Sequence, residues 1–383
     1  MSETILVTGG AGFIGSHLVD ALLERGHRVR VLDNLEPQVH GGLRERGERP
    51  AYLSPQVELI TGDVGDYATV RRALEGVQVV FHQAALVGVA QSMYEIARYT
   101  QGNTGGAAVL LQAVVDLKQR PRKLIVASSM SIYGEGAYRC PEHGLVYPRL
   151  RPAGQLQGHL WEMRCPIPGC PQEAKPVPTG EAKPLYPTSV YAITKRDHEE
   201  LFLTVGQAYG IPSVALRYFN AYGSRQALSN PYTGVAAIFS GRLLSGKAPV
   251  VYEDGGQLRD FTHVSDIVQA NLLAMDDPRA DGQSLNVGTG RPLSILHVAN
   301  LLIEYFRKEG LEQTLFPEIV SQFRAGDIRH CYGDITRLQA LGYRPKVRFE
   351  DGLRELVAWV ASQTASDSFD QARQELDRRG LTV

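Results

Sequence analysis

A glycine-rich turn near the start of the chain restricts the possible folds more than any other feature. A short apolar run, residues 5–8, precedes the turn, and residues 16–23 follow it at helical spacing. The turn itself contains Gly9, Gly12 and Gly15. Because glycine has no side chain, the backbone can turn tightly there and approach a pyrophosphate at the positive end of the helix. Ordinary loop packing is the alternative, so the surrounding pattern must decide.

Apolar runs that alternate with helical segments continue this pattern along the chain. Each run is short enough for a buried strand, and the alternation suits the βαβ units of a parallel sheet. We therefore predict the α/β fold class, with a Rossmann-like doubly wound parallel sheet and a smaller mixed α/β domain toward the C-terminus. The predicted strands are 5–8, 29–33, 57–60, 77–81, 123–127 and 213–216.

Asp33 ends the second predicted strand, about 20 residues beyond the glycine turn. A carboxylate at this place accepts hydrogen bonds from an adenosine ribose and repels a 2′-phosphate, so it favours NAD over NADP. The alternative is a solvated aspartate in a turn. Asp63 ends the third predicted strand and is less distinctive, since such aspartates often cap turns.

Tyr191 and Lys195 stand at positions i and i+4, on one face of a predicted helix. Tyrosine is a poor base at neutral pH, but a nearby ammonium and an oxidised nicotinamide both favour its phenolate. The same spacing also occurs as a solvated pair on many helices. Here Ser129 ends the fifth predicted strand, where ligands bind in doubly wound folds, so it can reach the same substrate hydroxyl. Together the three residues predict a catalytic set.

Between residues 139 and 183 prolines recur, and neither helical nor strand periodicity persists. Such a segment cannot bury a continuous apolar face, so we interpret it as an insertion held by something other than a hydrophobic core. Cys140 with His143, and Cys165 with Cys170, form the paired ligands of a structural Cys₃His zinc site. Bound zinc would supply folding energy directly. The alternative is a disordered loop with incidental thiols.

The charge balance of the 383-residue chain excludes several classes of partner. Lys and Arg total 40 against 41 Asp and Glu, a net charge of −1, so we expect no nucleic acid and no membrane as partner. No apolar run is long enough for a membrane span, and the first residues do not resemble a signal peptide. The expected location is cytoplasmic, where the four cysteines stay reduced.

Taken in order, these motifs resemble the extended short-chain dehydrogenase/reductase superfamily, specifically its NAD-dependent nucleotide-sugar epimerase and dehydratase branch (UDP-galactose 4-epimerase-like), with an unusual Cys/His insertion. The resemblance covers residues 4–134 and 184–360. The matching segments are 8–15, 62–64, 82–85, 128–134, 191–195, 216–220, 259–264 and 285–288.

The resemblance implies a role for each matching residue. In this family the residue matching Tyr191 is the base, that matching Lys195 lowers its pKa and holds the nicotinamide ribose, and that matching Ser129 contacts the reacting sugar oxygen. The implied NAD-binding residues are Gly9, Gly12, Phe13, Ile14, Asp33, Asn34, Asp63, Val64, Gln83, Ala84, Ala85, Tyr191, Lys195 and Phe219. The implied residues for a nucleotide-diphosphate sugar are Val87, Ser129, Ser131, Asn220, Arg259, Arg324, Asp327 and Cys331. We interpret His82 and His263 as structural.

The residues after Ser129 distinguish the reactions of this branch. Dehydratases of the family carry Asp-Glu there, the acid and base that expel water, whereas this chain has Met130 and Ser131. Neither side chain can shuttle a proton at neutral pH, so we expect epimerisation at C4 through a transient 4-keto intermediate rather than 4,6-dehydration. The alternatives are a 4-ketosugar reductase, a different epimerase and, outside enzymes, an NAD-binding regulatory protein with a zinc module.

Two positions depart from UDP-galactose 4-epimerases. Val87 stands where those enzymes often carry lysine, which suggests a different sugar or a different contact. Cys331 matches a position where, in that group, a small side chain admits N-acetylated sugars and a bulky one restricts the pocket.

We expect three parts along the chain. Residues 1–136 and 184–217 form the NAD-binding Rossmann domain, residues 137–183 form the insertion, and residues 218–383 form mostly a substrate-binding domain, with some segments returning to the Rossmann domain. Because the insertion joins the strand and the helix that bear the catalytic set, we hypothesise a lid or a partner-docking surface. The mostly polar segment 364–379 is predicted to be a solvent-facing helix or a tail. The resemblance also implies a homodimer.

Overall fold

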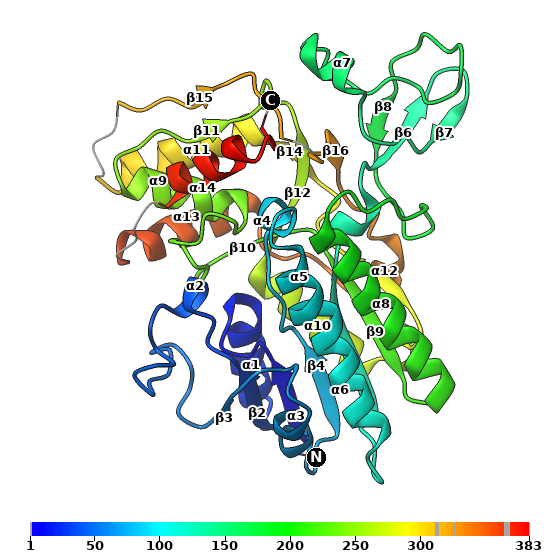
Figure 1. The fold of residues 1–383 in the computed structure, drawn as a ribbon, viewed down its shortest axis with the longest axis vertical. Coiled ribbons are helices and arrows are strands. Elements are labelled where there is room, and N and C mark those ends of the chain that lie inside the picture. Colours follow the sequence, from blue (N-terminus) through cyan, green and yellow to red (C-terminus); the bar gives the residue numbers. More distant parts are fainter. Residues whose placement is uncertain (1, 311–313, 325, 364–367, 383) are drawn as a thin grey trace.

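A seven-stranded parallel sheet is the base of the first of two lobes. The computed structural model describes residues 2–310, 314–324, 326–363 and 368–382 (Figure 1). The sheet has the order β13-β9-β5-β4-β1-β2-β3, which confirms the predicted doubly wound fold. Its order reverses between β1 and β4, the switch point where such sheets bind ligands. The strands are β1 (Thr4–Thr8), β2 (Arg28–Asp33), β3 (Glu58–Thr61), β4 (Val79–His82), β5 (Lys123–Ser129), β9 (Ser213–Tyr218) and β13 (Ser284–Val287).

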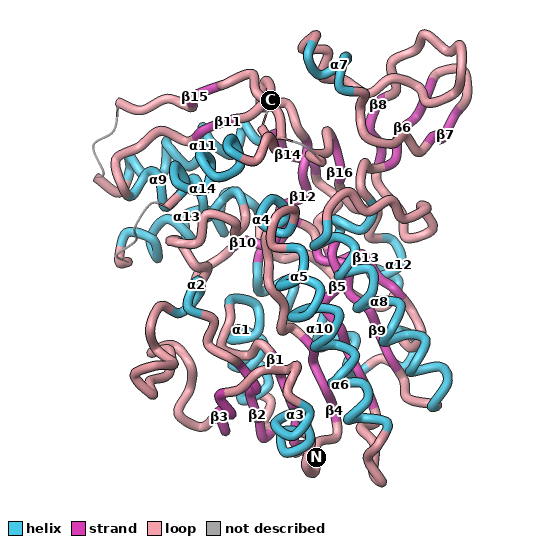
Figure 2. The backbone as a smooth tube through the Cα atoms, in the orientation of Figure 1, coloured by secondary structure: helices cyan, strands magenta, loops and turns pink. Residues whose placement is uncertain are grey.

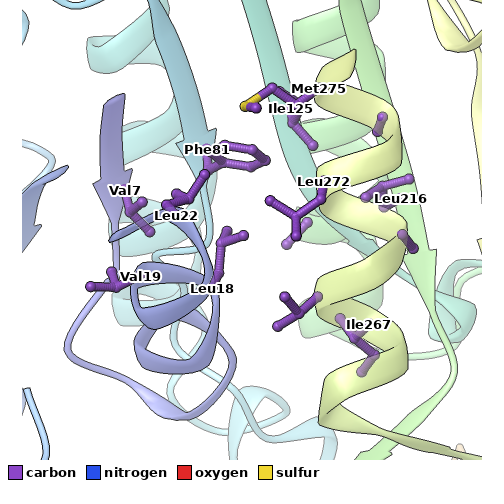
Figure 3. Close-up of a cluster of buried hydrophobic side chains, with 14 of the residues drawn as sticks. Val7, Leu18, Val19, Leu22, Phe81, Ile125, Leu216, Ile267, Leu272 and Met275 are labelled. Carbon is purple, nitrogen blue, oxygen red and sulfur yellow. The ribbon is translucent and has the colours of Figure 1, made fainter. Parts of the chain in front are cut away.

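Helices cover both faces of this sheet because its strands are apolar on both sides. The helices are α1 (Phe13–Glu24), α3 (Tyr67–Ala73), α6 (Gly106–Val115), α8 (Val190–Tyr209), α10 (Val264–Asp276) and α12 (Thr336–Ala340). Ile5 and Val7 of β1 pack in one core with α1 and α10, whereas Leu6 packs in the other with α3, α6 and α8. Figure 3 shows Leu18 of α1 and Leu272 of α10 in the first core. This burial fixes the strand ends that carry the predicted site.

Short helices follow several strand ends of the first lobe. They are α2 (Pro37–His40), α4 (Val89–Ser92), α5 (Ile96–Tyr99), the π-helix η1 (Thr100–Gly105) and the 3₁₀ helices η2 (Met130–Tyr133) and η3 (Pro278–Ala280). α5, η1 and α6 follow one another without a break, so a wider turn interrupts one long helix.

Among the described residues, no helix combines the length and the apolarity that a membrane crossing requires.

The second lobe contains small sheets packed against helices. In it, β12 pairs with β10, β14 and β16, and β11 pairs with β15. Its strands and helices are β10 (Asn220–Tyr222), β11 (Val250–Val251), β12 (Leu258–His263), β14 (Pro292–Ser294), β15 (Glu318–Ile319), β16 (His330–Cys331), α9 (Val235–Leu244), α11 (Ile295–Lys308), α13 (Phe349–Ala361) and α14 (Phe369–Arg378). Although α10 and β13 lie between these segments in the sequence, they pack in the first lobe.

The insertion, residues 137–183, stands apart from the parallel sheet, at the upper right of Figure 1. It contains antiparallel strands in the order β7-β6-β8, and most of the rest is loop (Figure 2). Its elements are β6 (Ala137–Cys140), β7 (Gly144–Val146), α7 (Ala153–Gln157) and β8 (Lys175–Val177). The sequence shows no strand periodicity here because these strands are too short for a repeat.

The C-terminal helix α14 is not the solvent-facing segment expected from the sequence. Phe369, Ala372 and Leu376 are buried, and Phe369 packs with Val250 and Tyr252 of the second lobe. These three positions lie at i, i+3 and i+7, so one apolar stripe holds a helix that is otherwise charged. Residues 364–367 of the expected segment lie outside the described residues.

Candidate active site

A cavity of about 1370 Å³ lies between the two lobes, at the C-terminal ends of the parallel strands. Its wall includes the glycine turn and the loops after β2, β3 and β4 on one side, and parts of β10, α9 and β12 on the other. Every residue predicted to bind NAD lines this cavity. So does every residue predicted to bind the substrate, except Cys331. The structure therefore brings two residue sets, scattered along the sequence, into one site.

Side chains at the glycine turn would collide with the chain around it. Gly9 has a φ of +69°, and a Cβ there would lie 2.6 Å from the Ala84 nitrogen. A Cβ at Gly15 would lie 2.1 Å from the Gly9 carbonyl oxygen. Helix α1 begins after Gly12, and no described side chain caps its first turn or places an acid in it. Its terminal N–H groups are therefore left for an anion, which fits the pyrophosphate of a dinucleotide.

Asp33 ends β2 in the cavity wall, and its carboxylate is buried rather than solvated. It accepts hydrogen bonds from the N–H groups of Ala11 (3.0 Å) and Leu35 (2.9 Å). Burial raises the pKa of Asp33, and these hydrogen bonds oppose the rise. Beside it, Asn34 donates to the Asp63 carboxylate (3.1 Å). The arrangement suits the hydroxyl donors of a ribose and disfavours a 2′-phosphate.

Tyr191 and Ser129 meet in the cavity. Tyr191 lies in the first turn of α8, where the Ser189 side chain caps the helix by accepting the Ala192 N–H (3.1 Å). The Tyr191 N–H donates to Ser92 Oγ (3.0 Å). Burial raises the pKa of the Tyr191 phenol to about 12, and the polar side chain of Ser129 partly offsets the rise. The pair can hold one substrate hydroxyl between a latent base and a hydroxyl group.

Lys195 is buried one helical turn after Tyr191. Its ammonium donates a hydrogen bond to the Ala127 carbonyl oxygen (2.9 Å) and lies 3.5 Å from His198 Nδ1. Burial lowers its pKa to about 7. Its hydrogen bonds in the described structure do not include the Tyr191 phenol. Ionisation of that phenol therefore needs further positive charge, such as an oxidised nicotinamide ring.

Asn103 of η1 supports the site and is not revealed by the sequence pattern. Its Oδ1 accepts the Leu86 N–H (2.7 Å), and its Nδ2 donates to the Leu86 carbonyl oxygen (3.1 Å) and to Thr194 Oγ1 (3.0 Å). It thus ties the loop of Val87 to the helix of Tyr191. The one signal in the sequence is the group of glycines around Asn103, which is unusual within a helix.

Two arginines face the other end of the cavity. Arg259 donates to the carbonyl oxygens of Ile328 (2.7 Å) and Arg329 (2.9 Å), and no described carboxylate forms an ion pair with it. Arg324 donates to the Asp327 carboxylate (2.8 Å). A guanidinium that is oriented by neutral carbonyl groups keeps its charge available for phosphate oxygens.

Unpartnered polar atoms mark the same end of the cavity. Asn220 Oδ1, Gln226 Oε1 and Gln257 Oε1 are buried without a partner among the described residues, and all three side chains line the wall. Buried polar groups are nearly always hydrogen-bonded, so these atoms indicate a polar ligand. Nothing in the sequence distinguishes the two glutamines.

The positions after Ser129 place no acid beside the catalytic set. Met130 and Ser131 line the cavity at the start of η2, and Ser131 Oγ donates to Ser129 Oγ (3.0 Å). The acidic residues of the described wall belong to β2 and the loops after β2 and β3, except Asp327, which pairs with Arg324. The two positions therefore lie where the sequence predicts, and they offer no carboxylate.

Cys331 lies behind the cavity wall rather than in it. Its side chain is buried against Met130, Tyr133 and Phe219, and its Sγ lies 3.8 Å from Thr179 Oγ1. Any influence of Cys331 on the pocket must pass through Met130 and Phe219, which do line it. Val87, by contrast, lines the cavity directly.

Two histidines of the matching motifs take part in packing instead of lining the cavity. The His82 ring stacks on Phe202, and its Nδ1 lies 2.8 Å from Thr8 Oγ1. His263 caps α10 by accepting the Ser265 N–H. Both placements agree with a structural role.

Helix α14 supplies a part of the wall that is missing from the sequence predictions. Phe369, Ala372, Arg373 and Leu376 line the cavity, and Arg373 donates to Gln322 Oε1 (2.9 Å). The apolar stripe of α14 is the signal that could have revealed this contribution.

The four predicted zinc ligands meet within the insertion. Cys140 Sγ lies 3.6 Å from His143 Nδ1 and 3.8 Å from Cys170 Sγ, and Cys165 Sγ lies 3.6 Å from His143 Nδ1. All four ligand atoms lie within 4.8 Å of one another, and the three cysteines are not in disulfides. None of the four lines the cavity. Such a closed set can hold one tetrahedral ion away from the site of the reaction.

A family model and individual relatives match the chain. The model of the NAD dependent epimerase/dehydratase family matches residues 5–152 and 167–288. The unmatched stretch between these ranges lies within the insertion. Over 380 residues the chain is 33% identical to a dTDP-L-rhamnose 4-epimerase of Burkholderia thailandensis. This alignment covers 98% of this chain and 97% of the relative.

Solved structures share the fold over most of the chain. The UDP-glucose 4-epimerase of Thermus thermophilus in complex with NAD is 31% identical and has a TM-score of 0.72, over 94% of this chain and 100% of that one. The UDP-glucose 4-epimerase of Thermotoga maritima with UDP-glucose is also 31% identical, with a TM-score of 0.72 over 94% of this chain and 98% of that one.

Proposed function

This chain belongs to the NAD dependent epimerase/dehydratase family, and from that premise we propose that it inverts C4 of a nucleotide-diphosphate sugar with bound NAD⁺. The observation that carries the proposal is the meeting of Tyr191 and Ser129 within one cavity. A cradle for a dinucleotide extends to one side of them, and guanidinium groups suited to a diphosphate lie on the other. The 4-epimerases among the relatives support the same reaction.

The proton transfer uses the chain's own residues. Tyr191 takes the proton of the sugar O4 while Ser129 hydrogen-bonds to the same oxygen. Because burial holds the pKa of the unassisted phenol at about 12, the phenol ionises only when positive charge stands near it. Lys195 and the nicotinamide ring are the sources of that charge. The site is therefore inactive as a base until the cofactor is in place.

NAD⁺ held at the glycine turn and Asp33 would supply the acceptor for the C4 hydride and later its donor, so the reaction would have no net redox change. With the O4 proton on Tyr191 and the hydride removed, the sugar is a 4-ketone whose C4 is flat. Arg259 and Arg324 hold the diphosphate while the hexose turns over in the pocket. Tyr191 then returns the proton to O4. Because the hydride comes back to the opposite face, the configuration at C4 is inverted.

The wall opposes dehydration as the reaction. A 4,6-dehydratase needs an acid and a base beside C5 and C6 of the sugar, and Met130 and Ser131 supply neither. A 4-ketosugar reductase could use the same tyrosine and serine, but it would consume external NAD(P)H mole for mole. A 4-epimerase needs no external reductant, which separates the two.

The decisive experiment is a substrate panel. Purified protein is incubated with UDP-, dTDP-, GDP- and CDP-hexoses without added cofactor, and NMR reads the configuration at C4. We expect inversion of at least one sugar, and Tyr191→Phe is the matched control because it removes a single oxygen. Consumption of NADH without inversion would assign a reductase. Retained NAD with no turnover of any sugar would assign a regulatory protein.

We also propose that the Cys/His cluster holds a structural zinc ion. Zinc ligands at about 2.3 Å for sulfur and about 2.0–2.1 Å for nitrogen, placed on a tetrahedron, stand about 3.8 Å (S to S) and about 3.5–3.6 Å (S to N) apart. Three separations in the cluster match these values: 3.8 Å between the Cys140 and Cys170 sulfurs and 3.6 Å from His143 Nδ1 to each of Cys140 and Cys165. All four ligand atoms lie within 4.8 Å of one another. Ligand geometry thus supports an ion that holds the insertion together.

Metal analysis of protein purified without added metal tests this site. We expect one zinc ion per wild-type chain and its loss in His143→Ala. Cys331→Ser is the matched control, because it removes a buried thiol outside the cluster and should leave the zinc in place. Zinc content unchanged in His143→Ala would contradict the assignment.

The homodimer implied by the resemblance and the cytoplasmic location stay predictions. Light scattering of the purified chain tests the first. A dimer has twice the chain mass of 42.1 kDa.

A further inference from the structure

Buried charges that the proposed reaction does not use join the insertion to the second lobe. Arg151 of the insertion donates two hydrogen bonds to the Glu253 carboxylate (2.7 and 3.0 Å), and both side chains are almost fully buried. Arg329 forms ion pairs with Glu253 (2.9 Å), with Asp254 (2.7 Å) and with Glu162 of the insertion (2.6 Å). The insertion and the second lobe thus each contribute charges that the other compensates.

Glu162 orients a second residue of the same segment. His330 Nε2 donates to Glu162 Oε2 (3.0 Å), and His330 Nδ1 accepts the Leu258 N–H (3.0 Å). This use of the two ring nitrogens corresponds to the neutral tautomer with its proton on Nε2. One carboxylate of the insertion therefore holds both Arg329 and His330.

The segment held in this way aims Arg259 at the cavity. Arg259 donates to the carbonyl oxygens of Ile328 (2.7 Å) and Arg329 (2.9 Å), next to the pairing of β12 with β16. The carboxylate of Glu135 accepts the N–H groups of Arg329 (3.0 Å) and His330 (3.3 Å). The direction of the Arg259 guanidinium, at the diphosphate end of the cavity, thus depends on the carbonyl oxygens of residues 328 and 329. Carboxylates that accept hydrogen bonds from this segment hold its backbone in place.

The Cys/His cluster lies next to Glu162 in the sequence, because Glu162 stands three positions before Cys165. The Met163 carbonyl oxygen accepts the Ala174 N–H (2.9 Å), and the Cys165 N–H donates to the Gln172 carbonyl oxygen (2.9 Å). Met163 and Cys165 both belong to the small apolar core of the insertion. Because this core is small, an ion at Cys165 would set the position of the whole segment that bears Glu162.

We propose that the insertion is a metal-locked positioning element for the diphosphate end of the cavity, acting through Glu162 and Arg151 on the segment that orients Arg259. The inference rests on the proposed function for its ligand class, a nucleoside diphosphate. No residue between 137 and 183, all of which the structure describes, lines the cavity. The structure therefore favours a positioning role over the lid hypothesised from the sequence, and Glu162 and Arg151 are positioning residues.

The test compares Glu162→Ala and Glu162→Gln with a control on the same insertion. Glu173→Gln removes a carboxylate whose ion pair with Lys175 is exposed and does not touch the second lobe. UDP and dTDP are titrated by calorimetry into each protein. Bound NAD, zinc content, kcat and KM are measured separately. Only a positioning role predicts a rise in KM with unchanged kcat, bound NAD and zinc content.

Glu162→Ala is expected to weaken binding of UDP or dTDP, whichever the wild type binds, by about tenfold or more, since it leaves buried Arg329 short of a partner. KM should rise in proportion, while kcat, bound NAD and zinc stay near wild type. Glu162→Gln, which keeps a hydrogen bond to His330, should lie between, and Glu173→Gln should match the wild type. His143→Ala should reproduce the loss of nucleotide affinity.

Nucleotide affinity equal to wild type in Glu162→Ala with full zinc content would overturn the inference. If Glu162→Ala also loses bound NAD, its fold is damaged, and Glu162→Gln becomes the deciding variant. Wild-type nucleotide affinity in Glu162→Gln then overturns the inference. If the wild type binds UDP or dTDP, the variants lose it and no sugar is inverted, the proposed function fails while the positioning role stands.

Discussion

The parallel sheet is held together by apolar burial, whereas we propose that a metal ion holds the insertion. The sheet buries apolar side chains on both faces, such as Leu18 of α1 and Phe202 of α8, which have no exposed surface. The apolar core of the insertion consists only of Tyr138, Cys140, Val146, Met163, Cys165 and Ala174, with Cys170 packed against it. Apolar burial is non-directional, whereas a metal site depends on particular ligand atoms. Perturbations that act on one region should therefore leave the other intact.

The same difference separates two tasks. The strand ends of the sheet carry residues that line the cavity, and no residue of the insertion lines it. What the insertion reaches is the backbone that directs Arg259.

Tyr191→Phe should have the largest effect and should leave the insertion untouched. Removal of the base is expected to lower kcat by about 10²- to 10⁴-fold. Zinc content and bound NAD should equal wild type. NMR of sugar inversion measures the rate, and a kcat close to wild type would contradict the role of Tyr191.

Removal of the metal should loosen the insertion and leave the parallel sheet intact. After chelation we expect the amides of residues 137–183 to exchange about a hundredfold faster, because local unfolding no longer costs the free energy of metal binding. Amides of β1, β4 and β5 should keep their protection. Mass spectrometry of exchanged peptides reads both regions in one experiment. Equal loss of protection in the sheet would show that the two regions are not independent.

Leu18→Ala should act on the sheet alone. A cavity in that core is expected to lower the free energy of unfolding by about 2–5 kcal/mol. Leu160→Ala is the matched control, since Leu160 is half-exposed on the insertion, and a change within about 0.5 kcal/mol is expected there. Urea denaturation measures both, and zinc content should not change in either. A large effect of Leu160→Ala would contradict the contrast.

The smallest effect concerns Glu135, at the base of the insertion. Burial raises its pKa from 4.5 to about 7. Between these values the folded state keeps a proton that the unfolded state releases, so the contribution of Glu135 to the free energy of unfolding falls as pH rises from 4.5 to about 7 and is constant above.

Glu135→Gln removes this titration. The free energy of unfolding of the wild type, minus that of the variant, should fall by roughly 1–3 kcal/mol across the window. Urea denaturation at several pH values measures the difference. A difference that does not change with pH would contradict the raised pKa.

The cofactor end of the site could be predicted because its signals are local. Gly9 directly follows β1 and Asp33 ends β2, so strand order places both at one edge of the sheet. The cysteine and histidine spacing likewise predicts a cluster that the structure brings together. In contrast, Asn103 and Leu376 reach the site or its support only through tertiary packing, and their local sequence gives a weak signal.

Cys331 shows a different limit. Its alignment with a pocket position of the resembled group predicts a segment near the cavity. It does not predict that Cys331 lies behind the wall, where Met130 and Phe219 separate it from the cavity. The strands of the insertion escaped prediction because three or four residues are too few for a period-two pattern.

The most direct test follows the hydrogen at C4. A nucleotide sugar that the wild type inverts is labelled there with deuterium, and the product is examined by NMR and mass spectrometry. Transient oxidation at C4 with return of the same hydride predicts that the inverted product keeps its deuterium at C4. Loss of the deuterium to solvent would contradict it. Inversion at C3 or C5 in place of C4, with uptake of solvent hydrogen there, would also contradict it.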